Sequence, residues 1–152
     1  MEMIIFTGIP GSGKSTFYKQ NFQDTHVLVS KDLMGNKNKP HKQRVQIEEA
    51  LKESKSIVVD NTNVTKEIRA ELIELGKQYS AKIIGYYFES IPRYCLYLNS
   101  LRTGKAKVPD VVIYKFNSQL EPQKYSEGFD ELFFVRIDSW SDFKYEVIKM
   151  VE

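Results

Sequence analysis

The sequence has little of several features that would assign a function class. Cys95 is its only cysteine, so no disulfide can close within the chain and zinc sites built on two or four cysteines are excluded. The only histidines are His26 and His41, which argues against a histidine-rich metal site. Neither sign of charge dominates, because 22 Lys and Arg against 20 Asp and Glu leave a net charge of +2. A basic surface for a nucleic acid or a membrane would therefore have to be local.

Long hydrophobic runs are also missing. No stretch approaches the roughly 18 consecutive apolar residues that a transmembrane helix needs, and the first residues lack the basic lead and apolar segment of a secretory signal. With 152 residues, 41% hydrophobic and 28% charged, the chain is long enough to bury most of its apolar surface as one soluble domain. We expect a cytoplasmic protein, since a lone reduced cysteine suits that compartment.

Apolar runs alternate with amphipathic segments along the chain. The pattern predicts strands over residues 3–7, 27–29, 57–59, 82–88 and 132–137. It predicts helices over residues 14–21, 41–55, 66–79, 93–102, 109–120 and 143–151. This alternation indicates an α/β fold, a parallel sheet with helices on both faces. Ligands of such sheets bind beyond the carboxyl ends of the strands, so the loops after Thr7, Val29 and Val59 are expected to form one active site.

The segment after the first predicted strand matches the phosphate-binding motif G-x-x-x-x-G-K-S/T and opens a predicted helix, the context that the motif requires. Its glycines let backbone N–H groups turn inward around phosphate oxygens. Lys14 supplies a positive charge for the β- and γ-phosphates, and the Ser15 hydroxyl is a ligand for Mg²⁺. A chance match in a glycine-rich turn is the alternative. The predicted nucleotide-binding residues are Gly8, Ile9, Pro10, Gly11, Ser12, Gly13, Lys14, Ser15 and Thr16.

ATP is the expected phosphate donor. Residues 36–39, N-K-N-K, superficially resemble the guanine-reading motif of GTPases, but they lack its aspartate and follow no apolar strand. The nucleotide loop therefore predicts binding of ATP with Mg²⁺, and residues 1–152 are expected to form a single P-loop kinase domain.

Two aspartates follow the next two apolar strands. Asp32, beside a transferring phosphoryl group, could accept the proton of an attacking hydroxyl, whereas an isolated Asp would more often cap a turn. Asp60 could hold Mg²⁺ directly or through water, or could fix the acceptor or a neighbouring side chain. Asn63 or Thr65 could simply cap the next helix, and that role is compatible with a functional Asp60.

Basic residues occur in two further places. Arg102 ends a predicted helix and enters a short basic, glycine-containing link, where it could close over phosphates as part of a lid or stay solvated. A second group could contact the phosphates of a nucleic acid strand, or form an ordinary solvated face; its members are Lys31, Lys37, Lys39, Lys42 and Arg44.

Three segments, V-S-K-D-L-M-G at 29–35, V-D-N-T-N at 59–63 and N-S-L-R at 99–102, resemble the polynucleotide 5′-hydroxyl kinase family. The likeness is greatest to the kinase domain of the eukaryotic polynucleotide kinase/phosphatases. It extends to V-P-D-V-V-I-Y at 108–114, L-E-P at 120–122 and E-G-F at 127–129, and so covers nearly the whole chain.

The resemblance implies ATP-dependent phosphorylation of a 5′-hydroxyl end of DNA or RNA. It assigns catalytic roles to Lys14, Asp32 and Arg102 and acceptor-side roles to Asp60, Asn61 and Lys31, with a helical lid over a P-loop NTPase fold. Gly35 and Leu98 stand where the phage branch has basic residues, which leaves the acceptor preference open. No D-x-D-G phosphatase motif is present, so the chain is expected to be a kinase only.

Two other functions stay open from the sequence. The same scaffold serves small-molecule kinases, whose acceptor is a nucleoside, a sugar, an antibiotic or a nucleotide-sugar. A non-catalytic nucleotide switch is the third candidate, and Asp32 after the second strand argues against it.

Overall fold

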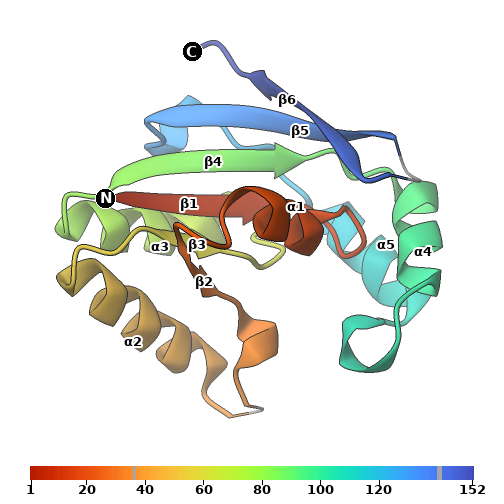
Figure 1. Ribbon diagram of the computed structural model, residues 1–152, viewed down its shortest axis with the longest axis horizontal. Helices are drawn as coiled ribbons and strands as arrows, with labels where there is room; N and C mark the ends of the chain where they lie inside the picture. The colour runs from red at the N-terminus through yellow and green to blue at the C-terminus, as the bar shows by residue number, and fades with distance from the viewer. Residues whose placement is uncertain (36, 140–141) are drawn as a thin grey trace.

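A computed structural model describes residues 1–35, 37–139 and 142–152; Asn36, the first residue of the rejected guanine-type motif, lies outside these ranges. Six strands form one sheet in the order β2-β3-β1-β4-β5-β6 (Figure 1). Their bounds are Glu2–Thr7 for β1, Val27–Val29 for β2, Ile57–Val59 for β3, Lys82–Phe88 for β4, Glu131–Ser139 for β5 and Lys144–Lys149 for β6.

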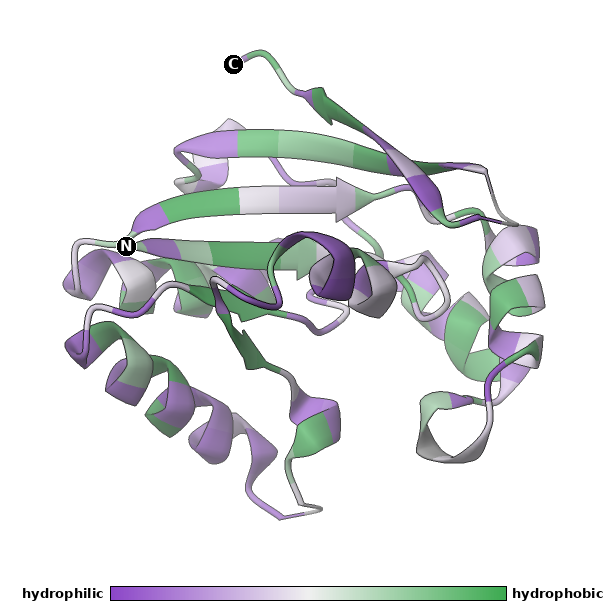
Figure 2. Cartoon of the chain, in the orientation of Figure 1, coloured by the Kyte–Doolittle hydropathy of each residue, from purple (hydrophilic) through white to green (hydrophobic). Residues whose placement is uncertain are grey.

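Helices cover both faces of the sheet, as the sequence predicts. The β1 strand lies at the centre, and its residues Met3 to Phe6 are almost fully buried, which explains its unbroken apolar run. Alternate side chains of β1 enter two cores. Ile4 and Phe6 pack with Phe17 of α1 (Lys14–Asn21) on one face. Met3 and Ile5 pack with α2 (Lys39–Lys52) and α3 (Lys66–Gln78) on the other, and Figure 2 shows the hydrophilic outer side of α2.

Two helices stand beside the carboxyl ends of the central strands (Figure 1). They are α4 (Pro92–Ser100) and α5 (Asp110–Gln119), and a small cluster of Ile9, Cys95 and Ile113 joins them to the glycine-rich loop. The segment between them holds a short 3₁₀-helix, η2 (Gly104–Ala106). Because α4 ends at Ser100, Arg102 belongs to this segment and not to a helix end.

The helix expected over 143–151 is wrong: residues 144–149 form β6, which pairs antiparallel with β5. Val147 opposes Val135 and Tyr145 opposes Ile137. β-Branched and aromatic residues favour such pairing, and the open edge of β5 supplies the partner that the local pattern does not reveal. The sheet is therefore parallel from β2 to β5 and carries one antiparallel edge strand.

Among the described residues, none of the helices combines the length and the hydrophobicity needed to span a bilayer.

Candidate active site

The loops that follow β1, β2 and β3 meet in one cleft of about 350 Å³, which the α4–α5 segment closes from the side. This arrangement follows from the parallel order β2-β3-β1, which puts all three carboxyl ends at the same edge. Eight of the predicted site residues line this cleft: Pro10, Lys14, Ser15, Lys31, Asp32, Asp60, Asn61 and Arg102.

The glycine-rich loop has the geometry of a phosphate cradle. Gly11 and Gly13 adopt φ values of 83° and 89°, which side chains with a Cβ rarely tolerate. A Cβ at Gly11 would also collide with the carbonyl oxygen of Cys95 in α4. Lys14 is 8% exposed, and its Nζ donates to the carbonyl oxygens of Gly8 (2.9 Å) and Ile9 (3.1 Å). Burial lowers the pKa of the Lys14 ammonium, and the nearby Asp60 carboxylate opposes that shift.

Two further observations in this loop fit a bound phosphate. The Ser12 hydroxyl is buried and finds no hydrogen-bond partner among the described residues, so it is free to donate a hydrogen bond to an anion in the loop. The helix α1 begins directly at Lys14, so the free backbone N–H groups of its first turn point toward the glycine-rich loop, where the phosphate would bind. Ile9, by contrast, is fully buried against α4 and α5, so its side chain has a packing role.

Ser15 and Asp60 form a pair of oxygen donors at the mouth of the loop. The Ser15 hydroxyl donates to Asp60 Oδ2 at 3.0 Å. Asp60 is 7% exposed; burial raises the pKa of its carboxyl group, while Lys14 and the Ser15 hydrogen bond oppose that shift. A hydroxyl and a single carboxylate suit Mg²⁺ at a nucleotide site, because this ion takes its remaining ligands from phosphates and water. No cluster of three metal-ligating side chains occurs in the described ranges.

Asp32 lies in a short 3₁₀-helix, η1 (Lys31–Leu33), and its side chain is exposed to the cleft. The capping role considered for Asp32 belongs to Ser30, whose Oγ accepts the Asp32 backbone N–H at 3.3 Å. The Asp32 carboxylate makes no hydrogen bond to any residue that the structure describes. It is thus an unengaged acceptor facing the same cleft as Ser15 and Asp60.

The loop after β3 combines structural and cleft-facing residues. Asn61 Oδ1 accepts the Lys31 backbone N–H at 2.9 Å, and its Nδ2 donates to Gln43 Oε1 at 2.6 Å, which fixes η1 and α2 relative to β3. Asn63 is buried with φ of 43° and donates to the Phe6 carbonyl oxygen at 2.8 Å. Of the two cap candidates that the sequence left open, Thr65 caps α3, by accepting the Ile68 N–H at 3.2 Å.

Asn99, the first residue of the N-S-L-R segment, has a role that the sequence did not assign. It is fully buried in α4 and pairs with the backbone of Val108: its Nδ2 donates to the Val108 oxygen at 2.7 Å, and its Oδ1 accepts the Val108 N–H at 3.0 Å. These two bonds clasp the base of the segment that carries Arg102. Arg102 Nη1 donates to the Ala106 oxygen at 3.2 Å within that segment, and the rest of its guanidinium faces the cleft. The sequence signal that could have identified Asn99 is its polar side chain among the apolar residues Cys95 and Leu98 on the buried face of α4.

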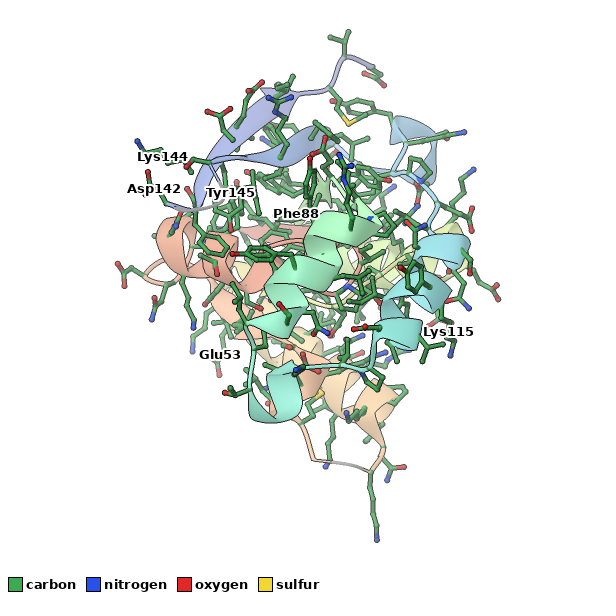
Figure 3. The ribbon with its side chains drawn as sticks, turned by 90° about the vertical axis from the view of Figure 1, so that its right-hand side faces the viewer. Glu53, Phe88, Lys115, Asp142, Lys144 and Tyr145 are labelled. Atoms are coloured by element: carbon green, nitrogen blue, oxygen red, sulfur yellow. The ribbon has the colours of Figure 1, made fainter. Side chains whose placement is uncertain are left out.

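Tyr145 of β6 is a second residue that the sequence reasoning missed. Its hydroxyl donates to the Gly13 carbonyl oxygen at 2.7 Å, and its ring packs edge-on against Phe17 with centroids 5.0 Å apart. It also has a side-chain hydrogen bond with Thr16, and burial raises its pKa to about 12. Figure 3 shows Tyr145 on the side of the sheet where α1 lies. The edge strand therefore supports the end of the phosphate loop.

The E-G-F segment at 127–129 supports the site indirectly, through Arg69. Glu127 is the partner of Arg69, a fully buried arginine of α3, with Nε to Oε1 at 2.8 Å and Nη2 to Oε2 at 3.0 Å. Arg69 also donates to the Asn63 and Pro122 oxygens, at 2.9 and 3.3 Å. Glu127, which belongs to the family-like E-G-F segment, thus has a structural role: it holds Arg69, and Arg69 holds the loop after β3.

Comparisons with known proteins agree with this geometry. A family model described as an AAA domain matches residues 3–123, most of the chain. A bifunctional polynucleotide phosphatase/kinase of Schizosaccharomyces pombe is 30% identical over 132 residues, which cover 84% of this chain and 32% of that protein. The chain therefore spans about a third of this relative's length. The match confirms the resemblance that the sequence motifs indicate.

Solved structures share the fold at low identity. A fungal RNA kinase superposes with a TM-score of 0.66 at 17% identity, over 90% of this chain and 38% of that one. A gluconokinase from Sinorhizobium meliloti superposes with a TM-score of 0.64 at 15% identity, over 93% of this chain and 86% of that one. Both likenesses show the P-loop kinase fold, and they extend to kinases of different acceptors.

Proposed function

Because the chain belongs to the AAA domain family whose model it matches, with the fold of a P-loop kinase, we propose that it transfers the γ-phosphoryl group of ATP to a 5′-hydroxyl end of DNA or RNA. We also propose that residues 1–152 act as a single kinase domain in this reaction. The observation that carries the proposal is the cleft in which the unengaged Asp32 carboxylate faces Ser15 and Asp60 beside the phosphate loop.

The proposed chemistry divides the cleft into two sides. On the donor side, the loop amides, Ser12 and Lys14 hold the phosphates, and Lys14 exchanges its carbonyl partners for phosphate oxygens. Ser15 and Asp60 would hold Mg²⁺, which supplies charge neutralisation at the β- and γ-phosphates. On the acceptor side, Asp32 accepts the hydroxyl proton as the 5′-oxygen bonds to the γ-phosphorus and the bond from that phosphorus to ADP breaks. Arg102 stabilises the charge on the transferring group.

A nucleic acid acceptor is supported by more than the P-loop. The 30% identical relative is a polynucleotide phosphatase/kinase, and the motifs at 29–35, 59–63 and 99–102 all contribute side chains to this cleft. Lys31 stands at the acceptor side of Asp32, where it can contact a phosphate of the acceptor strand.

A transfer assay tests the proposal. ATP labelled in its γ-phosphate is incubated with 5′-hydroxyl DNA and RNA oligonucleotides, with the same oligonucleotides already 5′-phosphorylated, and with nucleosides and gluconate. We expect label only on the 5′-hydroxyl oligonucleotides, and only with Mg²⁺ present. Label on a small molecule alone would make the protein a small-molecule kinase, and ATP binding without transfer to any acceptor would indicate a nucleotide switch.

A further inference from the structure

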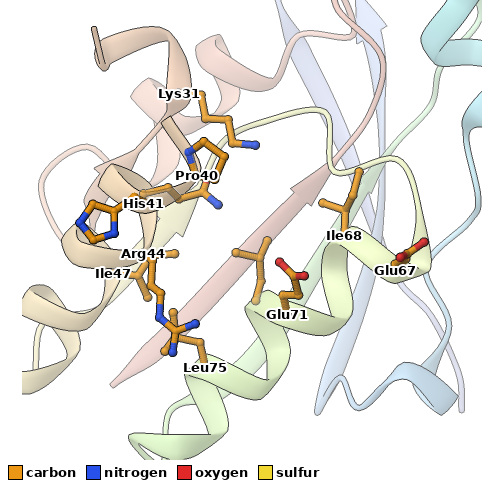
Figure 4. A pocket seen from close by; sticks show the side chains of 11 residues that line it. Lys31, Pro40, His41, Arg44, Ile47, Glu67, Ile68, Glu71 and Leu75 are labelled. Carbon is orange, nitrogen blue, oxygen red and sulfur yellow. The ribbon is translucent and has the colours of Figure 1, made fainter. Parts of the chain in front are cut away.

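A second hollow, a groove of about 490 Å³, lies between α2 and α3 (Figure 4). Pro40, His41 and Arg44 come from α2, and Glu67, Glu71 and Leu75 come from α3. Its volume is in the range of small-molecule sites. The phosphate loop does not reach this groove, since none of its residues 8–15 lines it.

The groove continues into the active-site cleft. Lys31 and Ile68 line both of them, and Lys31 is the residue next to Asp32. A molecule whose reacting hydroxyl lies at Asp32 can therefore extend past Lys31 into the groove without leaving the surface of the protein.

The two walls of the groove carry opposite charges. Lys31 and Arg44 are basic, and Figure 4 shows Arg44 on α2 facing Glu71 on α3. Within the described ranges no ion pair joins α2 to α3, and Arg44 pairs instead with Glu48 on its own helix, Nε to Oε1 at 3.2 Å. The remaining guanidinium N–H groups and the Glu71 carboxylate are thus available to a ligand. The floor between the walls is apolar, formed by Ile47, Leu72 and Leu75.

We propose that this groove binds the second nucleotide of the acceptor strand, an inference that rests on the proposed function. The phosphate that links the first and second nucleotides contacts Lys31 and Arg44. The second base lies over the apolar floor, and Glu71 accepts a hydrogen bond from its exocyclic amino group. A continuous run of phosphates would suit the basic wall but not the acidic one, so the observations favour a single unpaired base here.

This assignment predicts a dependence on acceptor length and on base. A dinucleotide with a free 5′-hydroxyl should be a better acceptor than a nucleoside 3′-monophosphate, because only the dinucleotide fills the groove. Adenine, cytosine and guanine present amino groups, whereas uracil and thymine present none, so the second base should matter.

The experiment compares kcat/KM for the two acceptors, each as DNA and as RNA, in the wild type, Arg44→Ala and Glu71→Gln. We expect Arg44→Ala to lower kcat/KM roughly tenfold for both acceptors, because both carry the phosphate that Arg44 contacts. Glu71→Gln should lower the ratio of dinucleotide to mononucleotide roughly tenfold where the second base carries an amino group, as for one hydrogen bond to a charged group. Glu71→Gln should in addition shift the preference at the second base toward uracil or thymine, since an amide can also donate. Lys52→Ala, at the exposed last turn of α2 and outside the groove, is the matched control.

The outcomes separate the two proposals. Transfer to nucleic acid acceptors with wild-type kcat/KM for both acceptors in Arg44→Ala and an unchanged ratio in Glu71→Gln would overturn the groove assignment and leave the proposed function standing. Absence of transfer to any nucleic acid, with transfer to a small molecule, would overturn both. Arg44 and Glu71 are exposed, so both variants should keep the wild-type melting temperature, which circular dichroism checks.

Discussion

Asp32 and Asp60 are two carboxylates in one cleft with different surroundings. Asp60 is buried, accepts the Ser15 hydroxyl and lies near Lys14, whereas Asp32 is exposed and makes no hydrogen bond to a described residue. A carboxylate held by a hydroxyl and an ammonium is suited to positioning a cation, and an unengaged one is suited to taking a proton. The environments, rather than the residue type, separate the two roles.

The first prediction concerns Asp32→Asn. The amide keeps the shape of the side chain but cannot accept the proton, and removal of a general base typically costs roughly 10²–10⁴ in rate. We expect turnover on a 5′-hydroxyl oligonucleotide to fall by that factor while ATP affinity and melting temperature stay near the wild type. A variant that is folded and retains more than about a tenth of wild-type turnover would exclude Asp32 as the base.

At the scale of elements, the segment between α4 and α5 depends on one side chain. The Asn99 side chain hydrogen-bonds to both the N–H and the C=O of Val108. These bonds hold the start of the segment, at the end of α4, next to its end, just before α5. Arg102 lies inside this closed segment. We therefore predict that Asn99 acts by positioning Arg102 and not by contacting the reacting atoms.

The second prediction is a double-mutant test of this clasp. Arg102→Ala should lower kcat far more than it weakens ATP binding. An arginine that stabilises the charge of a transferring phosphoryl group contributes on the order of 10³–10⁵ in rate, and one on a mobile lid contributes less. Asn99→Ala should lower kcat about tenfold or more, because the unpaired Val108 backbone loosens the segment. If Asn99 acts through Arg102, adding Asn99→Ala to Arg102→Ala should have little further effect. Full additivity of the two losses would contradict the clasp.

The elements also differ in how far the sequence could predict them. Most strands and helices from residue 2 to 120 follow from local patterns, because buried parallel strands are continuously apolar and the spacing narrows the cap of α3 to Asn63 or Thr65. The last element does not, because Tyr145 and Val147 form a strand only through pairing with β5, a partner about ten residues away. Because β6 is not predicted from the sequence, the hydrogen bond from the Tyr145 hydroxyl to the Gly13 carbonyl oxygen is not predicted either.

At the scale of the whole molecule, the cleft rests on contacts between distant parts of the chain. Gln123 Nε2 donates to the Ile5 carbonyl oxygen and to the Thr7 hydroxyl oxygen in β1. Arg69 donates both to the Asn63 carbonyl oxygen and to the Glu127 carboxylate. The convergence of the three loops could be predicted, since parallel strands share their carboxyl edge. The partners of Arg69 and Asn99 could not, because nothing in the local pattern identifies which distant group a buried polar side chain meets.

The last prediction concerns the buried ion pair. The side chains of Arg69 and Glu127 are 0% and 7% exposed, and removing one partner of such a pair leaves an uncompensated charge that typically costs about 3–5 kcal/mol. Since whole domains are stable by only about 5–15 kcal/mol, Arg69→Met should lower the urea midpoint strongly. It should also weaken nucleotide binding, because the Asn63 oxygen loses one of its two donors and keeps only the Thr7 hydroxyl.

Arg136→Met is the matched control. Arg136 is 46% exposed and pairs with Asp138 and Glu146 at 3.7 and 3.5 Å on the surface, where an ion pair is worth about 0–1 kcal/mol. Urea unfolding of both variants compares the same substitution in the two environments. Equal midpoints would mean that the Arg69 network does not stabilise the fold, and the loop after β3 would then owe its position to its other hydrogen bonds, such as those of Asn61 and Asn63.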